Sequence, residues 1–535
     1  MPHCLDQRQV PGASRLFTDY LYAYERVGQW YSAQLPPFAP ESLAAAARGA
    51  SLPAGRRQAL AEALAQAHRD LPPSAAREAN LARLRLPDTV AIVAGQQVGL
   101  FGGPLLTILK ALTAIKLAER LQSQGQNAVP LFWLASQDHD LAEINAAWAL
   151  DREARPQRIA VEAAASAGRV PVGRVRLGPG IATALTQWRA VTGGDGGLAD
   201  CYRPEATFAG AFRELMARWF EPWGLLFIDP LDPPMTALAA ETLSAAVARA
   251  PELLAALSQK SEELKAAGYH AQVETEDGAA LLFGEQQGQR VALRYEAGTW
   301  SWGAQRLESP ELLRRIAAEP HLFSPAALLR PVVQDALLPT AAQVCGPAET
   351  AYLAQSAALY RALERRQPLV YPRVSATLLE PRVRRWLEKY GLTVPQIWQQ
   401  PPSPDPGASL GAKLARETLP PGLEQALAAL RGAWEQDFQR VVEQIRALDP
   451  TLPDFATTAG AKMRHQLDQI ENRVSRALAR RQDDLERHAR GLVGALFPER
   501  HLQERLLTGA IWADAIPVLH ARIVPECADH QAIEL

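Results

Sequence analysis

Two short polar stretches carry the residues of this sequence that could do chemistry. Residues 95–104 join two adjacent glutamines to a glycine-rich loop, and residues 138–140 place a histidine between two aspartates. Glutamine amides hydrogen-bond polar ligands, and backbone N–H groups at a helix start bind anions. Histidine is the side chain whose charge changes near neutral pH. Together the two stretches suit the binding of a polar or phosphorylated substrate and the transfer of a proton.

The elements around these stretches predict that both serve one site. A β-branched run ends at Gly95, an apolar-periodic helix runs from Leu105 to Leu121, and a second apolar run, residues 129–136, follows. This is the pattern of a strand, loop, helix and parallel strand with a right-handed crossover. In such sheets ligands bind beyond the carboxyl ends of the strands, so we expect the two stretches to face the same cleft.

The glycine-rich loop has two possible roles. Its backbone could cradle a phosphate ahead of a helix that Pro104 starts, but its spacing matches no generic phosphate-binding motif. The alternative is a tight turn that packs a helix on a sheet. The candidate binding residues of this first unit are Gln96, Gln97, Gly99, Gly102, Gly103 and Asn145.

The candidate catalytic residues are His139, as a base or orienting group, with Asp138 and Asp140 on either side. The alternative is structural, because Asp140 is well placed to cap a helix that has Glu143 at its third position. We expect no metal here, since three consecutive side chains cannot readily converge on one ion.

Later strand ends add further candidates. Asp229 follows the apolar run 224–228, where it could instead be a helix cap or a turn acid. Gly346-Pro347 opens a helix as Gly103-Pro104 does. The remaining candidate binding residues from this half of the sequence are Arg330, Gly346, Glu349, Arg373 and Ser375.

Composition limits the protein class. The 535 residues are 48% hydrophobic and 21% charged, which predicts a globular protein of three or four units. The net charge of −2 with interspersed signs argues against nucleic acid and membrane surfaces as partners. The sequence has no long apolar run and no signal peptide, so we expect a cytoplasmic protein. Four scattered cysteines argue against a zinc ribbon and against a disulfide framework.

Periodicity changes along the chain predict its organisation. A proline-rich linker at 399–410 should mark a boundary, and alternation near 269–303 predicts antiparallel strands. The predicted segments are N-terminal helices 1–88, first core half 89–155, connecting insertion 156–222, core strand and helix 223–268, a second insertion with a small antiparallel sheet 269–325, second core half 326–398, coiled-coil hairpin 411–495 and a C-terminal segment 496–535 returning to the core.

The hairpin prediction rests on apolar residues that step by three or four from Leu423 to Leu448 and again from Met463 to Leu492. This spacing implies helices longer than 20 residues. Because the apolar seam is too narrow for a domain core, either the hairpin packs on the main body or a second copy covers it, and we expect the second, a homodimer.

Several motifs together resemble the bacillithiol-synthesis cysteine-adding enzyme family. They are Ala-Gly-Gln-Gln-x-Gly-Leu-Phe-x-Gly-Pro-Leu from Ala94, Asp-His-Asp-x-x-Glu-Ile-Asn from Asp138, Leu-Arg-Pro-Val-Val-Gln-Asp-x-Leu-Leu-Pro-Thr from Leu329, Gly-Pro-Ala-Glu-x-Ala-Tyr from Gly346 and Pro-Arg-Val-Ser from Pro372. The resemblance covers nearly the whole chain and extends to Leu502-Gln-Glu-Arg505. The sequence departs from the family's usual pattern at Gly102, Gln137 and Ala326.

The resemblance implies an α/β fold with a Rossmann-like, nucleotidyltransferase-type core, connecting insertions and a long antiparallel coiled-coil hairpin. It also implies a ligase that joins the carboxyl group of cysteine to the amine of glucosaminyl malate, with ATP or ADP as the nucleotide and no metal. Arg330 and Arg373 would then clamp the malate carboxylates, and Asp229 would pair with an amine. The competing hypotheses are a dimeric nucleotide-binding regulatory scaffold and an adenylyltransferase-like enzyme acting on another acid.

Overall fold

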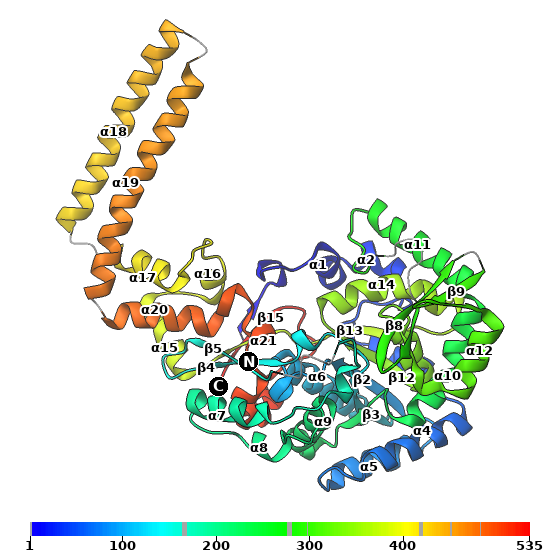
Figure 1. Cartoon of the computed structure of the whole chain (residues 1–535). Helices are drawn as coiled ribbons and strands as arrows, with labels where there is room; N and C mark the ends of the chain where they lie inside the picture. The colour runs from blue at the N-terminus through cyan, green and yellow to red at the C-terminus, as the bar shows by residue number, and fades with distance from the viewer. Residues whose placement is uncertain are drawn as a thin grey trace. The chain divides into compact units, whose positions relative to one another are not determined.

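A computed structural model describes residues 3–162, 168–274, 281–296, 298–416, 421–449, 452–481 and 483–535. These residues divide into two compact units (Figure 1). One comprises residues 1–149, 157–379 and 502–535, and the other comprises residues 150–156 and 380–501. The main segment of the second unit thus begins at Glu380, ahead of the proline-rich segment that we expected to mark a boundary. That segment ends inside a helix, α17, which begins at Pro406.

A five-stranded parallel sheet organises the larger unit, in the order β13-β12-β2-β3-β6. The strands are β2 (Val90–Gln96), β3 (Ala128–Leu134), β6 (Leu226–Ile228), β12 (Thr340–Cys345) and β13 (Leu369–Pro372). Every residue of β3 and of β12 is buried, as expected for strands covered on both faces. The chain adds strands outward from β2 in one direction and then returns to place β12 on its other side. The switch point between β2 and β12 is where such sheets bind ligands.

Helix α6 (Leu106–Ser123) crosses over from β2 to β3, close to the predicted span. Helix α14 (Pro347–Ala362) does the same between β12 and β13. The other helices of this unit are α1 (Arg15–Tyr22), α2 (Tyr24–Val27), α3 (Ser42–Gly49), α4 (Ala54–Ala67), α5 (Ala75–Leu84), α7 (Gly180–Thr192), α8 (Leu198–Cys201), α9 (Phe208–Trp219), α10 (Pro233–Ala248), α11 (Ala250–Ala266), α12 (Ser309–Ala318), α13 (Arg330–Leu337), α21 (Gln503–Leu506) and α22 (Ile516–Arg522). Together with the sheet they give the Rossmann-like fold that the sequence predicts.

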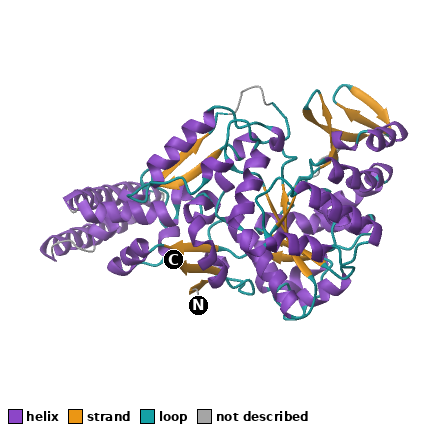
Figure 2. Ribbon diagram, turned by 90° about the horizontal axis from the view of Figure 1, so that it is seen from below, coloured by secondary structure: helices purple, strands orange, loops and turns teal. Residues whose placement is uncertain are grey.

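Three further sheets accompany the parallel one, and Figure 2 shows their strands among the helices. The largest is antiparallel, in the order β10-β9-β8-β7-β11. Its strands are β7 (Leu282–Gln286), β8 (Gln289–Glu296), β9 (Thr299–Trp302), β10 (Gln305–Glu308) and β11 (Phe323–Pro325). A second sheet joins β1 (His3–Leu5), β15 (His530–Glu534) and β14 (Ala376–Leu379), and a third joins β4 (Ala146–Leu150) and β5 (Pro156–Ala160).

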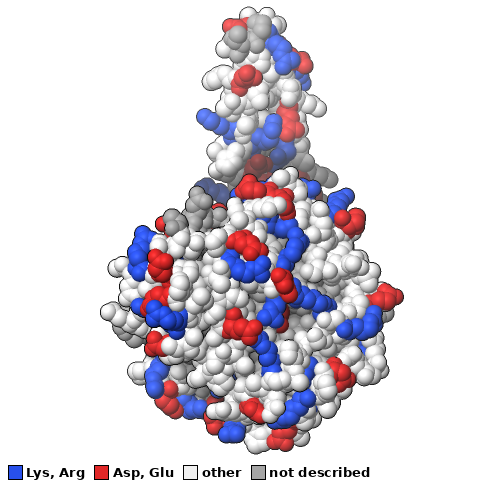
Figure 3. Space-filling model, turned by 90° about the vertical axis from the view of Figure 1, so that its right-hand side faces the viewer, with Lys and Arg blue, Asp and Glu red and all other residues white. Residues whose placement is uncertain are grey.

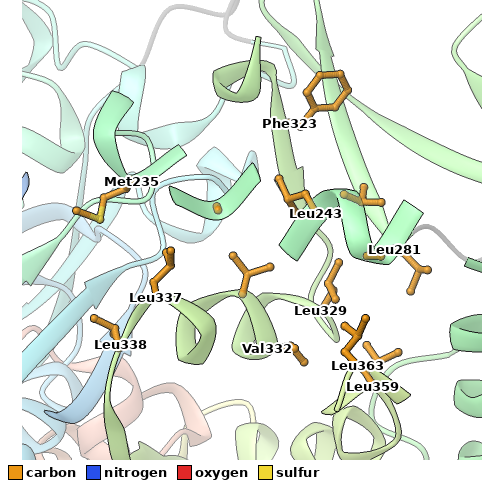
Figure 4. Close-up of a cluster of buried hydrophobic side chains, with 14 of the residues drawn as sticks. Met235, Leu243, Leu281, Phe323, Leu329, Val332, Leu337, Leu338, Leu359 and Leu363 are labelled. Atoms are coloured by element: carbon orange, nitrogen blue, oxygen red, sulfur yellow. The ribbon is translucent and has the colours of Figure 1, made fainter. Parts of the chain in front are cut away.

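One hydrophobic cluster links the sheet, the antiparallel insertion and the helices between them. It includes Val93 and Leu131 of the parallel sheet, Leu243 of α10, Val332 of α13 and Leu359 of α14, all buried. Figure 4 shows how side chains from these helices converge with Leu281 and Phe323. Burial of such side chains stabilises the fold by roughly 1.5–3 kcal/mol each. The insertion is therefore anchored to the core by continuous packing.

The smaller unit is helical. Its helices are α15 (Pro381–Tyr390), α16 (Val394–Trp398), α17 (Pro406–Arg416), α18 (Pro421–Leu448), α19 (Pro453–Arg481) and α20 (Asp483–Leu496). Helices α18 and α19 contain 28 and 29 residues, which confirms the predicted length above 20. Arg431 of α18 pairs with Asp468 and Glu471 of α19 at 2.6 and 2.9 Å, so the two helices lie side by side.

Charged side chains of both signs intermingle on the face drawn in Figure 3. This agrees with the small net charge of the sequence. Among the described residues, no helix is long and apolar enough to span a membrane.

Two buried histidines should make the protein sensitive to acid. His68 and His530 are buried, and burial lowers the pKa of each to about 4. Between pH 6.5 and 4 these two imidazoles bind protons in the unfolded chain but stay neutral in the folded state. The free energy of unfolding should therefore fall as pH drops through this range. We expect a loss of about 3 kcal/mol for each histidine.

Urea unfolding at pH 7 and pH 4.5 measures this loss. His68→Gln should flatten the pH dependence, whereas His270→Gln, at an exposed histidine, should leave it unchanged. Equal pH dependence in wild type and His68→Gln would contradict this assignment.

Candidate functional site

A cavity of about 680 Å³ lies at the carboxyl ends of the parallel strands in the larger unit. It is lined by residues from the ends of β2, β3 and β12, from the first turn of α14 and from the antiparallel insertion. Its polar lining consists of Gln96, Gln97, Lys110, Gln137, Asp138, His139, Arg290, Arg330, Gln334, Gln343, Glu349, Tyr352, Arg373 and Arg505. The cavity therefore occupies the switch point where a ligand is expected.

Parts of the two polar stretches predicted to share a cleft line this cavity, Gly95 to Gln97 from the first and Asp138 and His139 from the second. Gln97 donates from Nε2 to Asp138 Oδ2 at 3.0 Å and to the Glu143 carboxylate. Both hydrogens of this amide nitrogen are thus held by acids, and its Oε1 remains as an acceptor. Gln96 accepts a hydrogen bond at Oε1 from Lys110 at 3.0 Å. The prediction that the loops face one cavity is confirmed.

His139 is held by an arginine from the antiparallel insertion. Arg290 Nη1 lies 3.3 Å from His139 Nδ1, while Asp138 Oδ1 accepts the backbone N–H of His139 at 2.7 Å. An arginine can only donate, so Nδ1 accepts and the neutral ring carries its proton on Nε2. Burial, then Arg169 and Arg290, lower the pKa of His139, against the opposing effect of Asp138. In this geometry His139 is neutral and Nε2 is a hydrogen-bond donor.

Replacing Arg290 by glutamine should therefore raise the pKa of His139 towards 6.5. If turnover requires neutral His139, the acid limb of the pH–rate profile should move to higher pH. A profile of kcat/KM between pH 5 and 8 measures the shift. Arg294→Gln, on the same strand but exposed, is the matched control and should leave the limb in place. An unchanged limb in Arg290→Gln would show that Arg290 does not set the charge of His139.

Asp140 has the structural role that was the alternative. Its Oδ1 accepts from the backbone N–H groups of Ala142 at 3.0 Å and of Glu143 at 3.4 Å, and so caps the 3₁₀ turn Leu141–Glu143. It is absent from the cavity lining among the described residues. Of the predicted catalytic residues, the structure brings Asp138 and His139 to the cavity.

The N–H groups of the glycine-rich loop are bonded within the protein. Gly99, Gly102 and Gly103 are buried, and their N–H groups serve the loop's own turns. Gly102 donates to Tyr202 Oη at 3.0 Å and to Gly99 O at 3.2 Å, and Gly103 donates to Leu100 O at 3.1 Å. Gly102 and Gly103 have φ of +87° and +70°, which explains the preference for glycine at both positions. These hydrogen bonds favour the tight-turn alternative over an anion site at these three residues.

Lys110 and Glu349 form a charged pair on one wall of the cavity. Lys110, buried in α6, donates to Gly95 O at 2.8 Å and pairs with Glu349. Glu349 also accepts the N–H of Gly346 at 2.8 Å and so caps α14. Burial lowers the pKa of Lys110, and Glu349 opposes this. Gly346 and Glu349 therefore lie in the cavity wall, as predicted, with Glu349 bonded within the protein.

Arg373 is already engaged by a carboxylate. Its Nη1 and Nη2 hold Glu504 Oε2 and Oε1 at 2.9 and 2.6 Å, with both side chains buried. The guanidinium group that we expected to bind a substrate carboxylate thus binds the carboxylate of Glu504 instead. Arg330 instead bonds neutral groups, Gln334 Oε1 at 3.0 Å and Tyr352 Oη at 2.6 Å.

Two cavity arginines form no ion pair among the described residues, although the Glu349 carboxylate acts electrostatically on both. Across the described ranges, neither Arg330 nor Arg505 has a carboxylate oxygen within 4 Å, the distance that defines an ion pair here. Both line the cavity. The cavity thus offers two guanidinium groups that an anionic ligand could neutralise.

Three predicted site residues, Asp229, Ser375 and Asn145, are not among the described residues that line the cavity. Asp229 accepts from Ser136 Oγ at 2.5 Å and from the Leu231 N–H at 2.9 Å, and burial raises its pKa. This matches its turn-acid alternative. Ser375 bonds Glu504 at 3.0 Å and His530 at 2.8 Å. Asn145 accepts the N–H of Val161 at its backbone oxygen.

The sequence analysis missed Lys110, Arg290 and Arg505. Lys110 had a signal, since it is the one charged residue in the apolar run 105–115. Arg505 lies in the motif from Leu502 but received no role. Arg290 lies on an exposed-looking alternating strand, and nothing local distinguishes it from Arg294. Of the three positions at which the sequence departs from the family's usual pattern, Gln137 and Ala326 line the cavity.

Comparison with known proteins agrees with this architecture. Residues 3–374 match the family model "Bacillithiol biosynthesis BshC, N-terminal Rossmann-like domain", and residues 376–511 match its "C-terminal coiled-coil domain". A relative from Koribacter versatilis is 40% identical over 95% of this chain and 94% of its own length. A relative from Solibacter usitatus is 36% identical over 99% of both chains. Both are named "Putative cysteine ligase BshC". The protein belongs to the BshC family of bacillithiol biosynthesis.

Proposed function

We propose that this protein is a cysteine ligase of bacillithiol biosynthesis that acts in the cytoplasm. It joins the carboxyl group of cysteine to the amine of glucosaminyl malate. Family membership and the names of the two relatives support the reaction class. The cavity supports the substrate class, because a malyl group carries two carboxylates and the cavity offers two guanidinium groups that form no ion pair among the described residues, Arg330 and Arg505. This charge match is the observation that carries the proposal.

Amide formation makes two demands on the site. The amine must be unprotonated when it attacks, and negative charge develops on the carbonyl oxygen of cysteine. Gln97 Oε1 is the acceptor assigned to the attacking amine, since its Nε2 is held by Asp138 and Glu143. His139 Nε2–H is the donor assigned to the developing oxyanion. A neutral histidine fits this role because its proton stays on Nε2 throughout.

The carboxyl group of cysteine must also be activated, and ATP is the proposed source. In a nucleotidyltransferase-type core the cysteine carboxylate would attack the α-phosphate of ATP and displace pyrophosphate, and the amine would then displace AMP from the resulting adenylate. The nucleotide is assigned to the same cavity, because that cavity lies at the switch point of the sheet, where such folds bind ligands. Measurement of pyrophosphate against phosphate during turnover separates adenylyl from phosphoryl transfer.

The direct test is product formation by purified protein from cysteine, glucosaminyl malate and ATP, followed by mass spectrometry. A product with the mass of the amide is expected. Nucleotide binding without that product would favour the regulatory scaffold. Pyrophosphate release with another acid, but not with cysteine, would favour an adenylyltransferase of different specificity.

We further propose that α18 and α19 form an antiparallel hairpin through which two copies dimerise. Leu430 and Val441 of α18, and Met463 and Ile470 of α19, are each about half exposed. Apolar side chains at coiled-coil spacing favour association with another helix surface. A second copy supplies the complementary seam.

The dimer should therefore depend on this seam. Wild-type protein should sediment at about twice the monomer mass, and Leu430→Glu should shift it to the monomer. Leu86→Glu is the matched control, because Leu86 is 45% exposed and Leu430 is 50% exposed. A wild-type monomer, or a dimer that survives Leu430→Glu, would contradict the proposal.

A further inference from the structure

Cysteines near the two ends of the chain meet at the protein surface. Cys4 lies on β1, which pairs with β15, and Cys527 lies in the turn that leads into β15. The two Sγ atoms are 3.1 Å apart, although 523 positions separate the residues in sequence. This distance is within about 1 Å of a sulfur–sulfur bond.

The pair differs from the other cysteines in its access to solvent. Cys4 is exposed and Cys527 is half-buried, whereas Cys201 and Cys345 are buried. Burial raises the pKa of Cys527 to about 12. An external oxidant therefore meets Cys4 first, and Cys527 is positioned to react with whatever forms on Cys4.

We propose that Cys4 and Cys527 are a redox-active dithiol that forms a reversible disulfide with a low-molecular-weight disulfide as oxidant. The Cys4 thiolate attacks one sulfur of the small disulfide, displaces one thiolate and leaves a mixed disulfide on Cys4. Cys527 then loses its proton to solvent and attacks Cys4 Sγ, which displaces the second small thiolate. Two protein thiols lose two electrons in total, and one small disulfide becomes two thiols.

The bond would fasten β1 to the segment that precedes β15. Strand β15 begins at His530, whose ring nitrogens lie 2.8 Å from Ser375 Oγ and 2.9 Å from Thr377 Oγ1. Ser375 precedes β14, and Thr377 lies on it. Closing so long a loop restricts the unfolded chain, so the oxidised protein should melt at a higher temperature than the reduced protein. This inference does not depend on the proposed ligase reaction.

Equilibration of the full-length protein in graded mixtures of glutathione and glutathione disulfide tests the pair. After acid quenching and denaturing alkylation, the reduced protein should show four modified cysteines and the oxidised protein two. A non-reducing digest should then contain a peptide that links Cys4 to Cys527. The linked peptide should disappear in Cys4→Ser and persist in Cys201→Ser.

Wild-type mapping decides the outcome even if a variant folds poorly. Four modified cysteines in every mixture, a link between any other pair, or an unchanged melting temperature in the linked protein would overturn the proposal. Mixed disulfide with glutathione on Cys4 without the internal link would also overturn it, since Cys527 would then not be the resolving thiol.

Discussion

Replacing His139 by alanine should lower the rate of amide formation by about 10²- to 10⁴-fold, the usual contribution of a positioned proton-transfer or donor group. The melting temperature should stay close to that of wild type. The reason is location, because His139 lines the cavity and its side chain contacts Arg290 rather than the hydrophobic core. Coupled measurement of kcat and of thermal unfolding separates the two effects.

A second replacement in the same cavity sharpens this test. Gln97→Ala should lower the rate similarly, since it removes the acceptor assigned to the amine. His270→Ala, at an exposed histidine, should leave the rate unchanged. A fall of many degrees in the melting temperature of His139→Ala would instead assign the histidine to structure.

Replacing Glu504 by glutamine should destabilise the protein by about 3–5 kcal/mol, the usual result of leaving one member of a buried ion pair without its partner. Arg373 would remain buried with its two donors facing a neutral amide. Although burial alone would raise the pKa of Glu504, Arg373 outweighs it and holds that pKa at about 2. The pKa is lower in the folded state than in the unfolded chain. The stabilisation is therefore present above pH 4.5 and is lost as pH falls through 2.

Urea unfolding at pH 7 measures the change. Glu526→Gln is the matched control, because Glu526 forms an ion pair of similar length with Arg120, at 3.0 Å, but is 44% exposed. Its effect should stay below about 1 kcal/mol. Similar losses in the two variants would show that burial does not set the strength of the Arg373 pair.

The Rossmann-like core could be predicted because its signals are local. A β-branched run, a glycine turn, a helix and a second apolar run predict β2, α6 and β3, and their order along the chain predicts a parallel pair. The coiled-coil helices were predictable for the same reason, since a repeat of three and four residues is written in consecutive positions.

The site could be predicted only where strand ends define it. Gln97 directly follows β2, and Asp138 and His139 lie in the loop after β3, so the pairing of these parallel strands brings them together. Arg290 reaches His139 from a strand 151 positions later, and no local pattern specifies that approach. The glycine loop has a clear local pattern, but that pattern fits two roles. Anion binding and a tight turn both require glycines, and only the hydrogen-bond partners of the loop distinguish the two.

The route of the chain through the larger unit also constrains the order of synthesis. Glu504 and Arg505 are translated after the coiled-coil helices, yet Glu504 anchors Arg373 and Arg505 lines the cavity. A nascent chain that stalls before residue 502 would already contain all five strands of the parallel sheet but would lack these groups. Such a fragment would leave Arg373 buried without its carboxylate partner, so the site can be completed only after synthesis has passed residue 505.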